Sequence, residues 1–155
     1  MRKFDEAGLQ ACKFQARLFE LSASGTKGSS PVFIKCFMHS DFAVMLDSGA
    51  SASGFYDADK ILAEMNGIYK LDRGKLKFSE EELYWIGYMY RYWSYVHEVS
   101  SRFVYGIIKP EELRALYLPY HSLDPENAIQ RICEAKNRKP GQSMLESLKK
   151  VYNFH

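Results

Sequence analysis

One stretch of the chain, residues 79–99, restricts the possible folds more than any other. It begins with Ser79, and Glu82 follows three residues later, which is the capping-box pattern of a helix N-terminus. Three consecutive acids, residues 80–82, occupy the first turn, where the helix dipole favours negative charge. From Leu83 onward the residues are apolar or aromatic on every side of a helix, so other elements have to surround it. The pattern predicts a central, tyrosine-rich helix.

The rest of the chain shows helical periodicity interrupted by caps, glycines and prolines. Apolar residues three or four apart predict helices over residues 3–21, 31–47 (with Ser30 as N-cap and a break at residues 40–41), 57–66, 101 to just before Pro110, 111–117 and 126–136. Irregular connections are expected at residues 22–30, 48–54, 68–78 and 118–123. Strand signals are few, so the fold class is all-α: a single compact, irregular helical bundle around the central helix.

The length and the charge distribution suggest one domain with a basic end. A chain of 155 residues fits one domain, which we assign to residues 1–136, with residues 137–155 as a basic C-terminal tail or terminal helix. The formal net charge is +2, yet residues 131–155 alone carry 6 Lys and Arg against 2 Asp and Glu. A tail of this kind is most often solvated surface. Contact with an acidic partner is the next most frequent role, and nucleic acid binding is less frequent than either.

Several protein classes are excluded by what the sequence lacks. No run approaches the ~20 apolar residues that cross a bilayer, and the first residues lack the apolar core of a signal peptide. We therefore expect a cytoplasmic protein without membrane contact. The histidines and cysteines stand apart, without the paired spacing of a metal site, so we expect no metal, no cofactor, and free, mostly buried thiols. These residues are His39, His97, His121, His155, Cys12, Cys36 and Cys133.

Four residues of the central helix form a candidate partner-binding stripe. Tyr84, Tyr88, Arg91 and Tyr95 follow the spacing i, i+4, i+7, i+11 and so share one helix face. Tyrosine and arginine are enriched among the residues that dominate protein–protein binding. The alternative is that the aromatic residues belong to the core and that the Arg91 guanidinium is satisfied inside the fold. The sequence leaves both interpretations open.

The loop predicted at residues 118–123 supplies a second candidate. Tyr120 and His121 lie close to Asp124, and a histidine beside a carboxylate is the usual arrangement for acid–base chemistry. A histidine next to a helix N-cap more often locks the loop by a hydrogen bond, which we favour here. No Gly-x-Ser-x-Gly elbow or phosphate-binding glycine loop is present to strengthen a catalytic interpretation. We therefore add Tyr120 and His121 to the partner-binding set and expect no catalytic residues.

Two long motifs resemble a known family. They are FSEEELYWIGYMYRYWSY at residues 78–95 and IIKPEELRALYLPYHSLDPENAIQRI at residues 107–132, with a weaker likeness at residues 32–41. These motifs are similar to a small family of bacterial proteins that look like antitoxins, encoded beside toxins resembling ADP-ribosyltransferases. The likeness covers about two thirds of the chain and leaves out residues 1–24 and those after residue 136.

The resemblance implies a non-enzymatic protein that neutralises a cognate toxin by steric occlusion. In this hypothesis aromatic residues anchor the complex, while Arg or Lys answer acidic residues of the toxin. Two alternatives remain. The first is a hydrolase-type enzyme that reverses a nucleotide-derived modification, with His121, Asp124 and Arg91 converging in one pocket. The second is a DNA-binding autoregulator that uses the basic tail.

Overall fold

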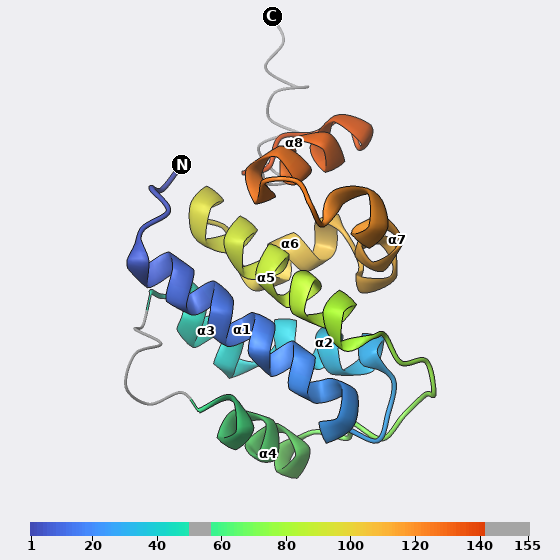
Figure 1. Ribbon diagram of the computed structural model, residues 1–155. Coiled ribbons are helices and arrows are strands. Elements are labelled where there is room, and N and C mark those ends of the chain that lie inside the picture. Colours follow the sequence, from blue (N-terminus) through green and yellow to red (C-terminus); the bar gives the residue numbers. More distant parts are fainter. Residues whose placement is uncertain (50–56, 142–155) are drawn as a thin grey trace, which may run out of the picture.

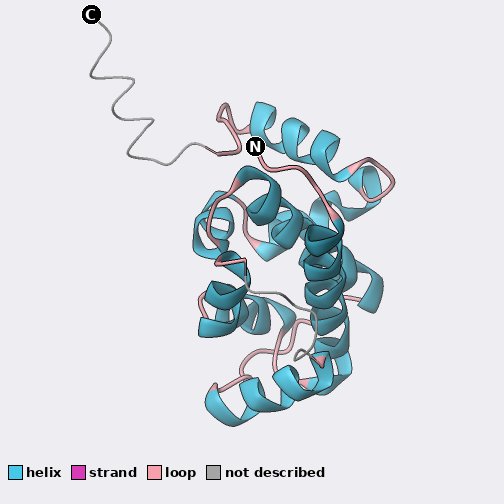
Figure 2. Ribbon diagram, turned by 90° about the vertical axis from the view of Figure 1, so that its left-hand side faces the viewer, coloured by secondary structure: helices cyan, strands magenta, loops and turns pink. Residues whose placement is uncertain are grey.

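The computed structural model describes residues 1–49 and 57–141, and helices are the only regular secondary structure in these two ranges (Figures 1 and 2). The all-α prediction is therefore confirmed. The helices are α1 (Glu6–Gly25), α2 (Ser30–Met38), α3 (Asp41–Asp47), α4 (Ala58–Ile68), α5 (Glu80–His97), α6 (Ser101–Ile107), α7 (Pro110–Tyr120) and α8 (Pro125–Ala135). The terminal helix expected beyond residue 141 lies outside the described residues.

Helix α5 occupies the centre of the bundle, as the sequence predicts. It runs side by side with α1 in the opposite direction, and it also contacts α6, α7 and α8 (Figure 1). Helices α2 and α3 lie behind this pair in the view of Figure 1, and α4 packs across the lower end of α1. The three largest fully buried side chains, Trp93, Arg91 and Tyr90, all belong to α5. One apolar cluster extends from Cys12 to Cys133 around it.

Small residues allow α1 and α5 to approach closely. A Cβ atom at Gly87 would lie 2.8 Å from the backbone carbonyl of Gln15 and 2.9 Å from the ring of Phe19. Because the two helices lie so close together, the side-chain amide of Gln15 donates a hydrogen bond of 3.1 Å to the Gly87 carbonyl. Near the start of α1, a Cβ at Gly8 would lie 2.6 Å from the Tyr95 ring. Glycines at the middle of α5 and near the start of α1 thus permit the close separation of the two central helices.

The capping box at the start of α5 forms as predicted. The Glu82 amide donates to the Ser79 hydroxyl at 3.1 Å, and the Ser79 amide donates to the Glu82 carboxylate at 2.9 Å. Arg114 of α7 lies 3.2 Å from the same carboxylate. Burial alone would raise the pKa of Glu82, but the hydrogen bonds from Ser79 and the charge of Arg114 outweigh it and lower that pKa. A local cap therefore also joins α5 to α7.

A buried ion pair joins four helices. The Arg91 side chain is 1 % exposed, and its Nη1 lies 2.6 Å from Asp47 Oδ1 at the end of α3. Its Nε donates to Gln15 of α1 at 2.8 Å, and its Nη2 donates to the Ser101 hydroxyl of α6 at 2.7 Å. Asp47 in turn accepts from the Ser101 amide at 2.9 Å and from the Ser101 hydroxyl at 2.7 Å. The guanidinium is thus satisfied inside the fold, which was one of the two interpretations of the sequence.

Two predicted helix ends are wrong for identifiable reasons. Helix α1 continues through the serines that were expected to end it, because the Ser22 hydroxyl bonds to the Phe19 carbonyl at 2.6 Å while Lys77 binds the Thr26 carbonyl at 2.7 Å. Helix α7 includes residues 118–120, which were expected to form a loop. The His121 amide donates to the Tyr117 carbonyl at 2.9 Å and closes the last turn across the proline at position 119.

The N-cap of α2 is also displaced from its predicted position. Ser29 is the cap, and its hydroxyl accepts from the Val32 amide at 3.3 Å. The predicted cap, Ser30, instead accepts from the Phe78 amide at 2.9 Å and is buried. The Ser30 hydroxyl is therefore bound to a segment 48 residues away along the chain. It does not cap the helix as the local sequence predicted.

The three cysteines are free thiols, as expected. Cys12 and Cys133 are buried and Cys36 is half-buried. Burial raises the pKa of Cys12 to about 12 and that of Cys133 to about 11. Both thiols are protonated at neutral pH and pack as small apolar side chains.

We predict that Ser79→Ala lowers the free energy of unfolding by ~1 kcal/mol, because it removes the hydroxyl that accepts from the Glu82 amide. Urea denaturation measures this difference. Ser24→Ala is the matched control, since Ser24 is an exposed serine within α1 and caps no helix. Equal stability of the two variants would contradict the capping role.

Asp47→Ala should lower the free energy of unfolding much more, by about 3 kcal/mol or more, because it leaves the Arg91 charge buried without its carboxylate. Removing both charges in the double variant Asp47→Ala with Arg91→Met should restore a large part of this loss. Thermal and urea unfolding of the three proteins test this. A double variant less stable than Asp47→Ala would show that the ion pair does not explain the effect.

Stability should fall at alkaline pH. Tyr90 is buried and donates to the Ile108 carbonyl at 2.6 Å, and burial raises its pKa well above the usual value; burial likewise raises the pKa of Tyr92 to about 12. Because tyrosines of the unfolded chain ionise near pH ~10, the stabilisation is complete below that pH and is lost as pH rises above it. Urea midpoints measured from about pH 9 to about pH 11 should decline, and Tyr90→Phe should decline less steeply. A flat profile would refute the assignment.

Candidate functional site

An aromatic groove of about 400 Å³ lies over the N-terminal half of α5, between α1 and α7. Its lining residues are Glu20, Glu81, Tyr84, Trp85, Tyr88, Tyr117 and His121. Three of them, Tyr84, Tyr88 and His121, belong to the partner-binding set predicted from the sequence. The groove therefore brings together half of that set on one accessible surface.

Ring contacts among Trp85, Tyr117 and His121 order the wall of the groove that lies along α7. The Trp85 and Tyr117 rings meet edge to face, with centroids 5.9 Å apart and planes at 74°. The Tyr117 ring stacks on the His121 ring at 4.3 Å. His121 Nδ1 lies 2.7 Å from the Tyr117 carbonyl, and because a carbonyl only accepts, Nδ1 carries the hydrogen. The His121 Nε2 is then a hydrogen-bond acceptor in the neutral ring.

The charged residues of the groove are carboxylates. Glu20 of α1 pairs with Arg17, one turn earlier on the same helix, and the Glu20 side chain remains 27 % exposed. Glu81 lies exposed in the first turn of α5. Burial raises the pKa of Tyr88 to about 12, so its hydroxyl is protonated at neutral pH. The groove is thus a cluster of neutral rings with two negative charges at its margin.

The other three predicted residues lie elsewhere. Arg91 is buried against Asp47 and presents no charge to a partner. Tyr95 lies at the opposite end of α5, where its hydroxyl donates to Asp5 at 2.5 Å and the Arg2 guanidinium covers its ring at 4.5 Å. Tyr120 is half-buried and packs against the core. Within the stripe, Arg91 is enclosed by α1, α3 and α6, whereas Tyr84, Tyr88 and Tyr95 remain half-buried.

The residues proposed for an enzymatic site do not converge. His121 lines the aromatic groove, whereas Arg91 lines a separate cavity of about 210 Å³ together with Asp47. Asp124 serves as the N-cap of α8, accepting from the Asn127 amide at 3.3 Å. His121 uses its Nδ1 on the carbonyl of its own helix. Each of the three residues thus has a structural role of its own.

Sequence reasoning missed four residues of the groove. They are Glu20, Glu81, Trp85 and Tyr117. Helical spacing contained part of the signal, since residues 81, 84, 85 and 88 follow i, i+3, i+4, i+7, and residues 117 and 121 are one turn apart. No local pattern places Glu20 beside them, because that contact depends on the antiparallel packing of α1 on α5.

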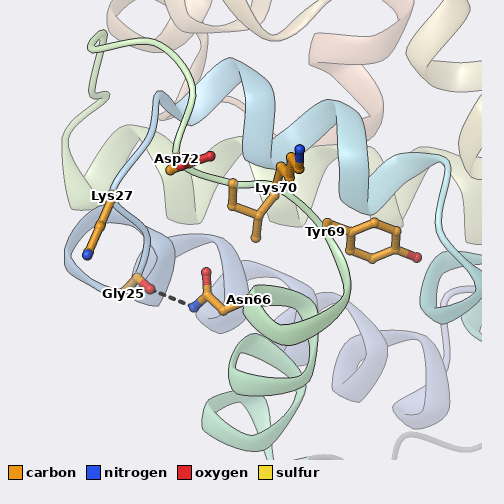
Figure 3. Close-up of a pocket in the computed structure, with 7 residues that line it drawn as sticks. Gly25, Lys27, Asn66, Tyr69, Lys70 and Asp72 are labelled. Carbon is orange, nitrogen blue, oxygen red and sulfur yellow. Dashed lines mark hydrogen bonds between the residues drawn. The ribbon is translucent and has the colours of Figure 1, made fainter.

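Basic residues gather on a different surface. A groove of about 510 Å³ between α2 and the segment after α4 is lined by Val32, Lys35, Cys36, His39, Tyr69, Lys70 and Arg73. A neighbouring cavity of about 450 Å³ shares its Tyr69 and Lys70, and there the Asn66 amide donates to the Gly25 carbonyl at 2.9 Å (Figure 3). In Figure 3 the side chains of Lys27 and Lys70 point in different directions, so they do not converge on one ligand.

In residues 1–49 and 57–141, no cluster of three or more His, Cys, Asp or Glu side chains has the arrangement of a metal site. Within the same ranges, none of the helices combines the length and apolar character that a bilayer span requires.

Comparisons with known proteins return no match. No family model matches the chain, no curated protein matches its sequence, and no solved structure matches its fold. The groove and its side chains are therefore the basis on which a function is assigned.

Proposed function

We propose that this protein binds a cognate toxin and neutralises it by steric occlusion, with the aromatic groove as the principal contact surface. The observation that carries the proposal is that Tyr84, Trp85, Tyr88 and Tyr117 come together on one accessible surface. Tyrosine and tryptophan are the residue types that dominate protein–protein binding energy. The resemblance of residues 78–95 and 107–132 to antitoxin-like proteins points to the same kind of activity.

Two tyrosine rings of the groove are accessible to a partner. Tyr84 and Tyr117 are half-buried and lie outside the apolar core cluster, so their rings are available for a partner. The stacking of Tyr117 on His121 orders this wall before binding, which lowers the entropy cost of association. A toxin segment in the groove would hold the body of this protein over the toxin's substrate cleft. An ADP-ribosyltransferase-like toxin would then be excluded from its nucleotide or its target.

The two alternatives receive less support. The enzymatic alternative needs Arg91 and His121 in one pocket, and they line separate cavities. The autoregulator alternative relied on the basic tail, most of which lies outside the described residues. Lys35, Lys70 and Arg73 give the described part of the chain a basic groove that could contact phosphates. Neither alternative gives a role to the aromatic rings of Tyr84, Trp85, Tyr88 and Tyr117.

The proposal predicts stoichiometric inhibition. Titrating the activity of the toxin encoded beside this protein should give a sharp endpoint near equimolar, because a binder does not turn over. Full protection at roughly a hundredth of an equivalent would indicate catalysis and favour the enzymatic alternative. No inhibition at any ratio would refute toxin neutralisation.

Variants connect the inhibition to the groove. Tyr84→Ala and Tyr117→Ala should each weaken the complex by a factor of about 30, which corresponds to the ~2 kcal/mol of a dominant binding residue. Val44→Ala is the matched control, because Val44 is 52 % exposed on α3 and does not line the groove. Equal affinities of all three variants would place the toxin on another surface.

A further inference from the structure

The aromatic groove combines ring faces and carboxylates in a way that selects the charge of its occupant. We propose that it binds an arginine side chain presented by the partner protein. This inference rests on the proposed function, since it specifies what the partner inserts. It also reverses the charge relation expected from the sequence, in which this protein was to supply the arginine.

The rings of the groove favour a cation. The face of an aromatic ring carries negative potential, and a guanidinium within about 6 Å of a ring centroid is attracted to it. The Trp85 and Tyr117 planes meet at 74°, so they form two walls of a corner rather than one flat surface. Tyr84 and Tyr88 lie one turn apart on α5 and line the same groove. A planar cation can therefore lie against one ring while a second ring flanks it.

Apart from the tyrosine hydroxyls and the Trp85 indole, the polar groups of the groove are acceptors. The Glu81 side chain makes no hydrogen bond or ion pair within the described residues, although it borders the groove. Within residues 1–49 and 57–141, the Glu20 carboxylate pairs only with Arg17, whose side chain is 56 % exposed, and such exposed pairs contribute little and exchange readily. His121 adds Nε2 as an acceptor in its neutral form, because Nδ1 donates to the Tyr117 carbonyl. Among the described residues that line the groove, none is a lysine or an arginine.

Arginine fits these groups better than the other cationic side chain. Its guanidinium is planar, stacks on aromatic faces and donates to carboxylates from several N–H groups. A lysine ammonium is more strongly hydrated and has no face to stack. The volume of about 400 Å³ holds one long side chain and excludes a whole helix. The occupant is therefore a single arginine anchor at the centre of a larger contact.

The test uses N-acetyl-arginine amide as the probe and N-acetyl-citrulline amide as its neutral, nearly isosteric control. Trp85 reports binding by fluorescence, since the other tryptophan, Trp93, is 1 % exposed and its indole donates to the Pro140 carbonyl at 3.0 Å. At constant ionic strength the arginine compound should produce a saturable change and bind at least about fivefold more tightly than citrulline, equivalent to about 1 kcal/mol. Trp85→Phe should remove the signal.

Neighbouring acids provide a matched pair of variants. Glu80 and Glu81 both lie exposed in the first turn of α5, but only Glu81 lines the groove. Glu81→Gln should weaken binding of the arginine compound about threefold or more, whereas Glu80→Gln should leave it within about a factor of two. Equal effects of the two substitutions would overturn the proposal.

Two further outcomes would also overturn it. They are equal affinity for citrulline, and no saturable change up to roughly 100 mM of the arginine compound. These outcomes are distinguishable from failure of the proposed function. If the protein fails to inhibit the toxin and still selects arginine over citrulline, the groove is a cation site and toxin neutralisation is wrong. If it inhibits the toxin at equimolar ratio without that selection, the function stands and the arginine anchor is wrong.

Discussion

The charge of Arg91 is buried at the point where α1, α3, α5 and α6 meet, and the arrangement of the bundle depends on its neutralisation. An isolated guanidinium in such a place would be too costly, so Asp47, Gln15 and Ser101 have to be brought to it. These partners come from three different helices, and each hydrogen bond fixes a helix against α5. Apolar packing alone tolerates small shifts of a helix, whereas a guanidinium with directed donors does not.

The same constraint decides which part of α5 is accessible to a partner. Because Gln15 must reach both Arg91 and the Gly87 carbonyl, α1 lies against the middle of the predicted stripe, at Arg91. The N-terminal half is left beside the end of α1 and beside α7, where the aromatic groove forms. The buried ion pair and the exposed groove are thus two consequences of one helix packing. A weakened ion pair should therefore also disturb binding in the groove.

Two grooves of this protein carry charges of opposite sign. Carboxylates border the aromatic groove, while Lys35, Lys70 and Arg73 line the groove beside α2. A net charge of +2 conceals this separation, because it averages the two surfaces. Electrostatic complementarity mainly sets the choice and the rate of association of partners. A partner that offers arginine to one groove and acids to the other would be held in a single orientation.

Local signals in the sequence predicted the described helices and several of their N-caps, whereas the N-cap of α2 and the ends of α1 and α7 differ from prediction. The Ser79 capping box and the break at Ser40 form as predicted, because a cap involves only residues three or four apart. Which residues form the aromatic groove depended on contacts between residues far apart in the sequence. Periodicity places Tyr84 and Arg91 on one face, but the packing of α1, α3 and α6 around α5 decides that Tyr84 is accessible and Arg91 buried. The sequence by itself determined the elements and their faces; the tertiary structure decided which faces are covered, since that depends on how the helices satisfy a buried charge together.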